Sequence, residues 1–286
     1  MGRSAFLLAV SAVCVSLSGC SDLFWDVFKA TGPRKPASRV KSNTAKVRSN
    51  SACWKYAQAE INANQAKLDA LEEEIKGKGV YRYVLRNGDE DRKEISLTFD
   101  DGPHPGYTLK LLDILKKEDV KATFFVIGHM AEKNPELVKR IASEGHEVAN
   151  HTYSHVTLTK ITPEEAQTEY KANNDVIRRL VGKRARYCRP PGGDFNSDVL
   201  KAAAVLNLTT VLWTDDPGDY DNPKPKFLLR KELSRLSPGG IILLHDGSKS
   251  TLATLVQFID EARKMGYTFV TLDELRQNKA EKNRPK

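Results

Sequence analysis

The sequence predicts an α/β protein whose parallel strands form a barrel-like sheet. Short apolar runs alternate with longer segments of helical periodicity, and this alternation favours parallel strands joined by crossover helices. Polar segments directly follow five of the runs, which is typical of the functional end of such barrels. The alternating part has roughly the 200 to 250 residues that one barrel domain uses, so we expect no second catalytic unit.

The expected elements follow in chain order. Seven runs are predicted to be strands, at residues 94–97, 122–127, 147–150, 185–188, 209–213, 240–244 and 268–271. Helical patterns are found at residues 108–118, 135–144, 162–182, 197–206 and 251–265. The longest helix begins with Thr162-Pro163-Glu164-Glu165, which has the composition of a capping box with Pro at the first helical position. These patterns place a helix between most consecutive strands, as a parallel sheet requires.

Two carboxylates and two histidines are the strongest functional signal. Asp100 and Asp101 end the first predicted strand, and His151 and His155 follow the third. One carboxylate with two imidazoles can hold a metal such as zinc and leave a position open for water, while the second carboxylate could take a proton. Alone, Asp-Asp-Gly-Pro is also a turn sequence, and two His four residues apart often share a helix face by chance. Their joint occurrence favours the metal site.

Three more segments follow predicted strands in the same way. Arg189 precedes Pro-Pro-Gly-Gly and offers a guanidinium that can bind a carboxylate. Residues 213–220 hold three carboxylates between aromatic residues, and His245 ends an apolar run. A proline-rich surface loop and a buried core histidine are the plainer interpretations. Because the carboxyl ends of barrel strands meet at one mouth, we expect all five polar segments to converge there.

These segments resemble the five motifs of the NodB-homology polysaccharide deacetylases, also called carbohydrate esterase family 4. All five occur in the family's order within roughly residues 93–275, and we assign the domain to residues 79–276. The resemblance implies a distorted, incomplete (β/α) barrel of about seven strands, which agrees with the seven predicted runs. It also implies hydrolysis of N-acetyl groups on an N-acetylglucosamine-containing polysaccharide, such as peptidoglycan or a chitin-like chain.

The resemblance also implies a role for each motif residue. Asp101, His151 and His155 would bind a divalent metal, with Zn²⁺ as the first expectation and Co²⁺, Ni²⁺ or Mn²⁺ as alternatives. Asp100 would be the general base that deprotonates the attacking water, and Arg189 would orient Asp100. Zinc would in addition polarise the acetyl carbonyl.

The second half of the site would protonate the leaving amine. His245 would be the general acid, and Asp219 would hold it and raise its pKa. Leu243 would line the acetyl pocket. Two positions depart from the family's usual residues, because Gly192 stands where an aromatic residue is common and Tyr220 stands where Trp is common. Both would contact sugar, so the departures concern the substrate cleft rather than the chemistry.

Two other functions stay open at this point. The chain could be an O-acetyl esterase acting on xylan or another acetylated glycan, because an ester needs less help from the acid than an amide does. It could also be a catalytically silent glycan-binding lipoprotein that keeps the fold. The enzyme is favoured because every expected catalytic side chain is present.

The first residues indicate export. Arg3 precedes an apolar run, and Leu17-Ser18-Gly19-Cys20 resembles the lipobox of a bacterial lipoprotein signal. We therefore expect a signal peptide at residues 1–19, lipidation of Cys20, and a membrane anchor at the cell envelope, on the outer membrane or periplasmic face in a Gram-negative cell. An ordinary secretory signal with a coincidental cysteine is the alternative.

A basic segment and a helix are expected before the barrel. Eight Lys or Arg residues and no acid lie between Lys29 and Lys55, so residues 20–53 are expected to be a disordered tether attracted to anionic lipid or wall polymer, or a plain linker. Nucleic acid is not an expected partner, because no aromatic residues interleave with these charges. Residues 54–78 carry a heptad-like stripe that could pack on the barrel or dimerise, which leaves the oligomeric state open. Residues 277–286 are expected to be a frayed polar tail.

The cysteine content fits an exported protein. Once Cys14 is lost with the signal peptide and Cys20 is lipidated, Cys53 and Cys188 remain. This pair could form a disulfide between the pre-barrel segment and the chain beside Arg189, or stay as two free thiols.

Overall fold

The structure is a computed structural model that describes residues 44–52, 54, 55, 57, 59 and 83–282. The predicted signal peptide at residues 1–19, the lipidation site Cys20, the cysteine Cys53 and most of the predicted helix 54–78 lie outside these residues. Within the described part of the chain, no helix combines the length and the apolar character needed to cross a membrane.

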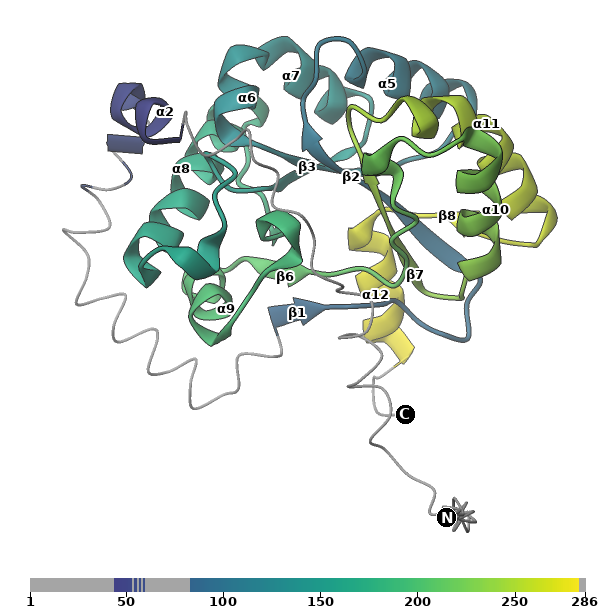
Figure 1. The fold of residues 1–286 in the computed structure, drawn as a ribbon. Coiled ribbons are helices and arrows are strands. Elements are labelled where there is room, and N and C mark those ends of the chain that lie inside the picture. The colour runs from purple at the N-terminus through teal and green to yellow at the C-terminus, as the bar shows by residue number, and fades with distance from the viewer. Residues whose placement is uncertain (1–43, 53, 56, 58, 60–82, 283–286) are drawn as a thin grey trace, which may run out of the picture. The chain divides into compact units, whose positions relative to one another are not determined.

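An incomplete barrel of eight parallel strands forms the centre of the fold (Figure 1). The strands are β1 (Val84–Leu85), β2 (Glu94–Gly102), β3 (Thr123–Val126), β4 (Glu147–Asn150), β5 (Tyr187–Cys188), β6 (Thr209–Val211), β7 (Gly240–His245) and β8 (Thr268–Phe269). Their order is β1-β6-β5-β4-β3-β2-β7, and β8 pairs with β2. The predicted parallel, incomplete (β/α) barrel is therefore confirmed, with the two-residue strand β1 added to the seven predicted runs.

The two outer strands of the sheet, β1 and β7, are not joined by a continuous row of backbone hydrogen bonds. Beyond β6, the chain makes a single parallel bridge from Asp215 to Ile242 of β7. On the other side of that segment, the backbone N–H of Leu212 donates to the carbonyl of Leu85 in β1. The chain after β6 therefore links both edges of the sheet and brings its own acidic residues next to β7.

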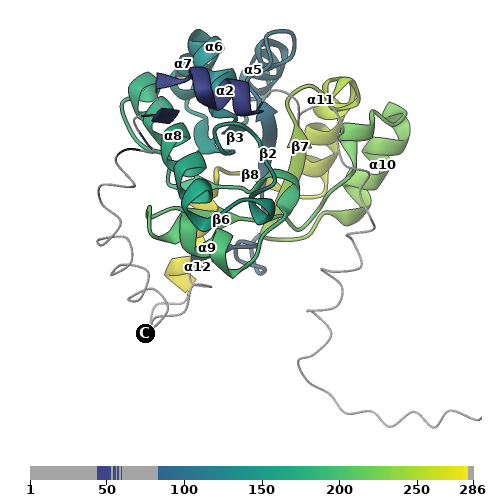
Figure 2. The same ribbon diagram turned by 60° about the vertical axis from the view of Figure 1, so that its left-hand side comes forward.

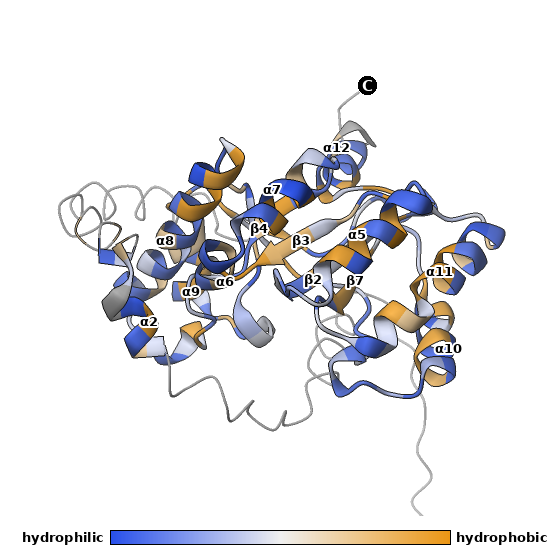
Figure 3. Cartoon of the chain, turned by 90° about the horizontal axis from the view of Figure 1, so that it is seen from above, coloured by the Kyte–Doolittle hydropathy of each residue, from blue (hydrophilic) through white to orange (hydrophobic). Residues whose placement is uncertain are grey.

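Helices surround the sheet in all views (Figures 1 and 2). They are α2 (Thr44–Asn50), α5 (Thr108–Lys117), α6 (Gly128–Lys133), α7 (Pro135–Ser143), α8 (Pro163–Val181), α9 (Ser197–Ala204), α10 (Pro225–Arg235), α11 (Lys249–Lys264) and α12 (Leu272–Lys282). Short 3₁₀ turns add η2 (Leu158–Lys160), η3 (Pro191–Gly193) and η4 (Asp219–Asp221). The helices show both hydrophilic and hydrophobic residues, whereas β3 is mainly hydrophobic (Figure 3).

The core lies between the strands and this helical layer. Strands in parallel sheets are covered on both faces, and β2 and β3 are accordingly buried over most of their length. The rings of Phe99 and Phe124 stack across the β2–β3 pair with 5.1 Å between centroids. This packing holds the register between β2 and β3. It therefore also positions the polar residues that follow the two strands.

The longest helix has the ends that its sequence predicts. Thr162 accepts a hydrogen bond from the Glu165 backbone N–H, while the Glu165 side chain accepts one from the Thr162 N–H, so the capping box is formed. At the other end Gly182 adopts a left-handed conformation with φ of 84°, which glycine tolerates best. α8 is therefore a stable platform beside β4.

Several elements differ from the sequence-based expectation. Residues 44–50, expected to belong to the disordered tether, form α2, and residues 277–282, expected to be a frayed tail, belong to α12. Helices α6 and α10 are additional to the five helical patterns. β2 is longer than predicted because its polar end continues to pair with β7 as far as Asp100 and His245.

Candidate metal and catalytic site

The two adjacent carboxylates lie at a bulge that ends β2. The register between β2 and β3 shifts between Phe99 and Gly102, and Asp101 has a φ of 70°. Such bulges redirect side chains that a regular strand would send to opposite faces. Both carboxylates accordingly face one histidine, since His151 Nε2 lies 3.8 Å from Asp100 Oδ2 and 3.3 Å from Asp101 Oδ1.

The two histidines lie in a loop after β4 rather than on a helix. Their four-residue spacing suggested a helix face, but residues 151–157 have no helical conformation. Instead Thr152 and His155 take left-handed backbone conformations, with φ of 64° and 56°. The His155 N–H donates to Thr152 Oγ1, which closes the loop. The centroids of the His151 and His155 rings consequently lie 4.9 Å apart.

Asp101, His151 and His155 form the one cluster of potential metal ligands found in the described part of the chain, with ligand atoms within 4.8 Å of one another. His155 Nε2 lies 2.9 Å from Asp101 Oδ1. His151 Nδ1 lies 2.8 Å from the backbone carbonyl of Arg189, so Nε2 is the ring nitrogen that faces Asp101 and is placed to bind a metal. One oxygen and two imidazole nitrogens are a suitable donor set for zinc and similar divalent metals.

The electrostatics of this cluster also suit a cation. Burial by itself would raise the pKa of Asp101, but its hydrogen bonds to His151 and His155 hold that pKa well below the usual range. Burial would lower the pKa of His155, but Asp101 raises it above the ordinary value. The carboxylate therefore attracts protons onto the imidazole beside it, and a divalent metal would take the place of that positive charge.

Arg189 holds the second carboxylate from inside the barrel. Its side chain is fully buried, and Nη1 donates to Asp100 Oδ1 at 2.7 Å and to Thr98 Oγ1 at 2.9 Å. The guanidinium also lies 4.2 Å from the centre of the Phe125 ring. One oxygen of Asp100 is thereby bound to Arg189, while the other, Oδ2, remains directed toward His151.

His245 stands opposite, at the end of β7. Its Nδ1 lies 2.7 Å from Asp219 Oδ1, and Asp219, itself fully buried, also accepts from the His245 N–H and from Thr251 Oγ1. Burial alone would lower the pKa of His245, but the hydrogen bond and charge of Asp219, with the charges of Asp101 and Asp100, raise it to about 9. His245 is therefore a protonated imidazole at neutral pH, with Nε2 as the nitrogen not engaged by Asp219.

The predicted sugar-contacting residues have different surroundings. Tyr220 is 46% exposed, and its ring meets the His245 ring edge-on at 5.5 Å. Gly192 is exposed in η3 with φ of 67°, three residues after Arg189. Leu243 is buried in β7. Because it lies two residues before His245, the two side chains point to the same face of the strand. The structure thus brings Tyr220 and Leu243 beside His245, and places Gly192 on the loop that follows Arg189.

Two supporting carboxylates were not predicted from the sequence. Asp246 accepts a hydrogen bond from Thr108 Oγ1 at 2.5 Å, and Thr108 Oγ1 accepts one from the His104 N–H. Burial raises the pKa of Asp246 to about 7, against the lowering effect of that hydrogen bond. Glu169 of α8 accepts from the Tyr153 and Ser154 N–H groups of the histidine loop. Asp246 could have been predicted as a site residue because it directly follows His245 in the sequence. No feature of the sequence near Glu169 indicates its contact with the histidine loop.

The candidate disulfide stays a prediction, because Cys53 lies outside the described residues. Cys188 itself is a buried thiol whose Sγ lies 3.7 Å from Thr210 Oγ1. Burial raises the pKa of the Cys188 thiol to about 12. The thiol is therefore protonated and acts as a small apolar side chain between β5 and β6.

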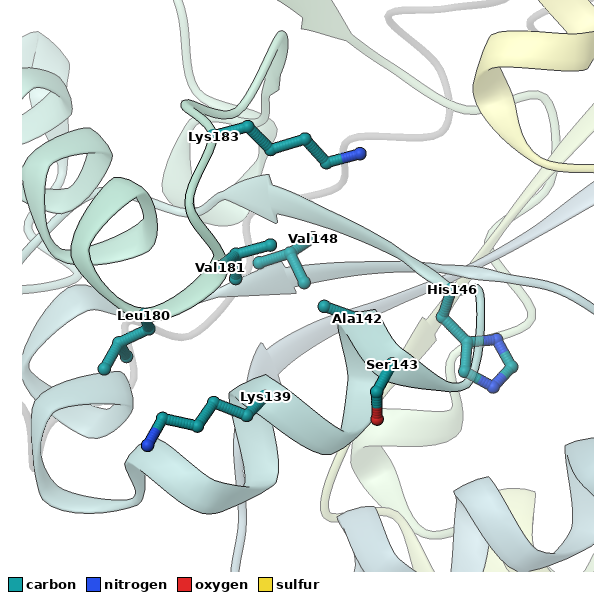
Figure 4. Close-up of a pocket in the computed structure, with 8 residues that line it drawn as sticks. All are labelled: Lys139, Ala142, Ser143, His146, Val148, Leu180, Val181 and Lys183. Atoms are coloured by element: carbon teal, nitrogen blue, oxygen red, sulfur yellow. The ribbon is translucent and has the colours of Figure 1, made fainter.

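A separate cavity of about 350 Å³ lies at the other end of the barrel. Residues of α7 and the end of α8 line it, together with His146 and Val148 (Figure 4). His146 precedes β4, whereas His151 follows it, so the cavity is at the amino end of that strand. The cavity therefore does not contribute to the cluster of carboxylates and histidines.

Comparison with known proteins gives consistent matches. The family model described as polysaccharide deacetylase matches residues 87–211, which include Asp100, Asp101, His151, His155 and Arg189. A peptidoglycan-N-acetylglucosamine deacetylase of Bacillus cereus is 38% identical over 198 residues, covering 68% of this chain and 92% of the relative. The peptidoglycan-N-acetylmuramic acid deacetylase PdaA of Bacillus subtilis is 39% identical over 192 residues, covering 66% and 73%. A crystal structure of the Bc1960 peptidoglycan N-acetylglucosamine deacetylase, 37% identical, has a TM-score of 0.67 and covers 69% of this chain and 95% of its own.

Proposed function

This chain belongs to the polysaccharide deacetylase family, and from that premise we propose that it removes N-acetyl groups from the sugars of peptidoglycan by metal-dependent hydrolysis. The family establishes the reaction class, an amide hydrolysis on a polysaccharide. Peptidoglycan is supported by the printed activities of the B. cereus and B. subtilis relatives. The observation that carries the proposal is the placement of Asp101, His151 and His155 next to an Asp100 that is held by Arg189.

Asp101, His151 and His155 would hold the metal in this proposal. A divalent metal bound there would polarise the acetyl carbonyl and make water a better nucleophile at neutral pH. The protein's part is to fix the ligands, and the hydrogen bond from His151 Nδ1 to the Arg189 carbonyl does so for one of them. Asp101 and His155 keep partly exposed side chains, which leaves access for water and substrate.

Asp100 is the proposed general base. Its Oδ1 accepts the hydrogen bond from Arg189, which fixes its orientation. Its Oδ2, near His151, is the oxygen that can take a proton from the attacking water. Because Arg189 is buried and also bonded to Thr98, the carboxylate cannot turn away from the site.

His245 is the proposed general acid. An amide nitrogen leaves only when it is protonated, so the site needs a proton donor on the leaving-group side. His245 carries that proton at neutral pH because its pKa is about 9, and Asp219 stabilises the imidazolium. In this proposal Asp100 accepts a proton and His245 donates one. The two residues are register partners on the adjacent strands β2 and β7.

Acetate release tests the proposed function. The metal-loaded protein is incubated with peptidoglycan, chitin oligomers and acetylxylan, and acetate is measured for each substrate. We expect release from peptidoglycan above all, with the Asp100→Asn variant as the inactive control. Activity confined to acetylxylan, or no release from any substrate with every candidate metal supplied, would contradict the proposal.

Attachment of the enzyme to the cell envelope is part of the proposal. The support is the sequence Leu17-Ser18-Gly19-Cys20 and the location of peptidoglycan outside the cytoplasmic membrane. Full-length protein expressed in a bacterial host should incorporate labelled palmitate and sediment with membranes. Cys20→Ser should abolish labelling, and a labelled Cys20→Ser protein would refute lipidation at this residue.

A further inference from the structure

The histidine loop is held in shape by one buried carboxylate. Glu169 lies in the middle of α8 and is fully buried. Its Oε2 accepts hydrogen bonds from the backbone N–H groups of Tyr153 at 2.8 Å and Ser154 at 2.7 Å. These two residues lie between His151 and His155, so the position of the Glu169 carboxylate determines how the loop curls between the two imidazoles.

The negative charge of Glu169 is balanced by Arg48, a residue of the helix α2 that precedes the barrel in the sequence. Arg48 of α2 donates to Glu169 Oε1 from Nε at 2.9 Å and from Nη2 at 2.6 Å. The Arg48 side chain is only 16% exposed, so the pair is shielded from water. Removing one partner of a buried pair leaves an uncompensated charge, which is far more costly than losing a surface ion pair.

Packing holds Arg48 at this position. Its guanidinium lies 4.6 Å from the centre of the Trp54 ring, and the Trp54 ring lies 6.1 Å from the Tyr153 ring of the histidine loop. Val47 and Trp54 pack against the main core cluster, and Ala57 is fully buried within it. α2 lies on the α8 side of the barrel (Figures 1 and 3). The pre-barrel segment is thus part of the structure that supports the loop.

We propose that Arg48 is a positioning residue which, through Glu169, holds the loop of His151 and His155 and thereby sets the metal affinity of the site. The inference rests on the proposed function in taking these two histidines as metal ligands. It extends the functional unit to a segment that precedes the residues matched by the family model, which begin at residue 87. Arg48 does not touch the ligands. It acts mainly through the carboxylate, and its one direct hydrogen bond to the loop, from Nε to Ser154 Oγ, is longer at 3.3 Å.

A double-mutant cycle tests this inference on the full chain. The variants are Arg48→Met, Glu169→Gln and the double substitution, and zinc affinity is measured on metal-free protein by competition with a chromogenic chelator. Arg263→Met is the matched control, because Arg263 of α11 also pairs with a carboxylate, Glu118 at 3.7 Å, and lies over an aromatic ring, Phe269, and neither partner belongs to the histidine loop. Circular dichroism melts show that each variant is folded before its affinity is compared.

We expect Arg48→Met to weaken zinc binding about tenfold or more, as loss of a partner behind a metal ligand typically does. Arg263→Met should leave the affinity within about twofold. In the Glu169→Gln background, Arg48→Met should cost much less, because the ion pair with Glu169 is already lost and only the longer contact with Ser154 Oγ remains. An unchanged affinity in Arg48→Met, or an equal loss in both backgrounds, would overturn the inference.

A second readout separates this inference from the proposed function. Hydrogen exchange of the Tyr153 and Ser154 amides, measured on metal-free protein, should accelerate in Arg48→Met and not in Arg263→Met. This measurement requires neither bound metal nor acetate release. Unchanged exchange would refute the coupling even in an active enzyme, whereas faster exchange in a protein that releases no acetate would leave the coupling standing and refute the proposed function.

Discussion

Asp100 and Asp101 are chemically identical neighbours that have different surroundings. Asp100 is bound by the buried guanidinium of Arg189, while Asp101 faces two imidazoles and is partly exposed. The environment of a carboxylate decides whether it serves as ligand, base or acid. The bulge at the end of β2 allows both to face the same space while keeping separate partners.

Asp100→Asn separates catalysis from metal binding. The amide keeps the shape of the side chain but cannot accept a proton, so we expect turnover to fall by about two to four orders of magnitude. Bound metal, measured by elemental analysis, should remain near that of the wild type. His151→Ala should lose both metal and turnover. Normal acetate release by Asp100→Asn would refute the assignment of the base.

Asp219→Asn tests the acid. Burial lowers the pKa of His245 and Asp219 raises it, so removing the Asp219 charge lowers that pKa from about 9. The acid then loses its proton at a lower pH, and the alkaline limb of the kcat/KM profile should move toward neutral pH. Wild type and variant are compared at equal metal loading, since bound metal also affects this pKa. An alkaline limb that does not move would show that it reports another group.

At the scale of elements, α8 contributes more than a crossover between strands. Its buried face carries polar side chains that bind the carboxyl ends of neighbouring strands and the loop between them. Asn173 donates through Nδ2 to the carbonyls of Val126 and Thr152 and to Asn150 Oδ1. The helix therefore fixes the ends of β3 and β4, from which the histidine loop begins.

Asn173→Ala should destabilise the fold by about 2 kcal/mol or more, because it removes the buried hydrogen bonds of the Asn173 Nδ2 group to the ends of β3 and β4 and opens a small cavity. Urea unfolding of the metal-free protein provides the measurement. Gln277→Ala, at an exposed position of α12, is the control and should change stability by less than about 0.5 kcal/mol. Equal stability of Asn173→Ala and wild type would show that these hydrogen bonds contribute little.

Much of the architecture could be predicted from the sequence, because strands and helices with strong patterns appear where expected. β1 has two residues and α6 has six, so neither offers a periodic pattern long enough to recognise. The conformation of the loop that carries His151 and His155 was not predicted, because its curl depends on Glu169, a contact that local sequence does not reveal. The residues taken from the five motifs were predicted. The supporting carboxylates Asp246 and Glu169 were not, nor was the contact of Arg48 with Glu169 across 121 positions.

At the scale of the whole molecule, parallel strand order explains why segments far apart in the chain meet. β2, β4, β5, β6 and β7 all end at the same side of the sheet, so the polar segments that follow them are collected at one mouth. The apolar strands and helices beneath this mouth keep it in shape.

The central claim is that Asp101, His151 and His155 bind the catalytic metal. Crystals soaked in zinc, with diffraction recorded on both sides of the zinc absorption edge, test it most directly. The account predicts the strongest anomalous peak at about 2.0 to 2.2 Å from Asp101 Oδ1 and from Nε2 of both histidines. An active protein whose zinc peak lies elsewhere, or that shows no peak among these three residues, would contradict it.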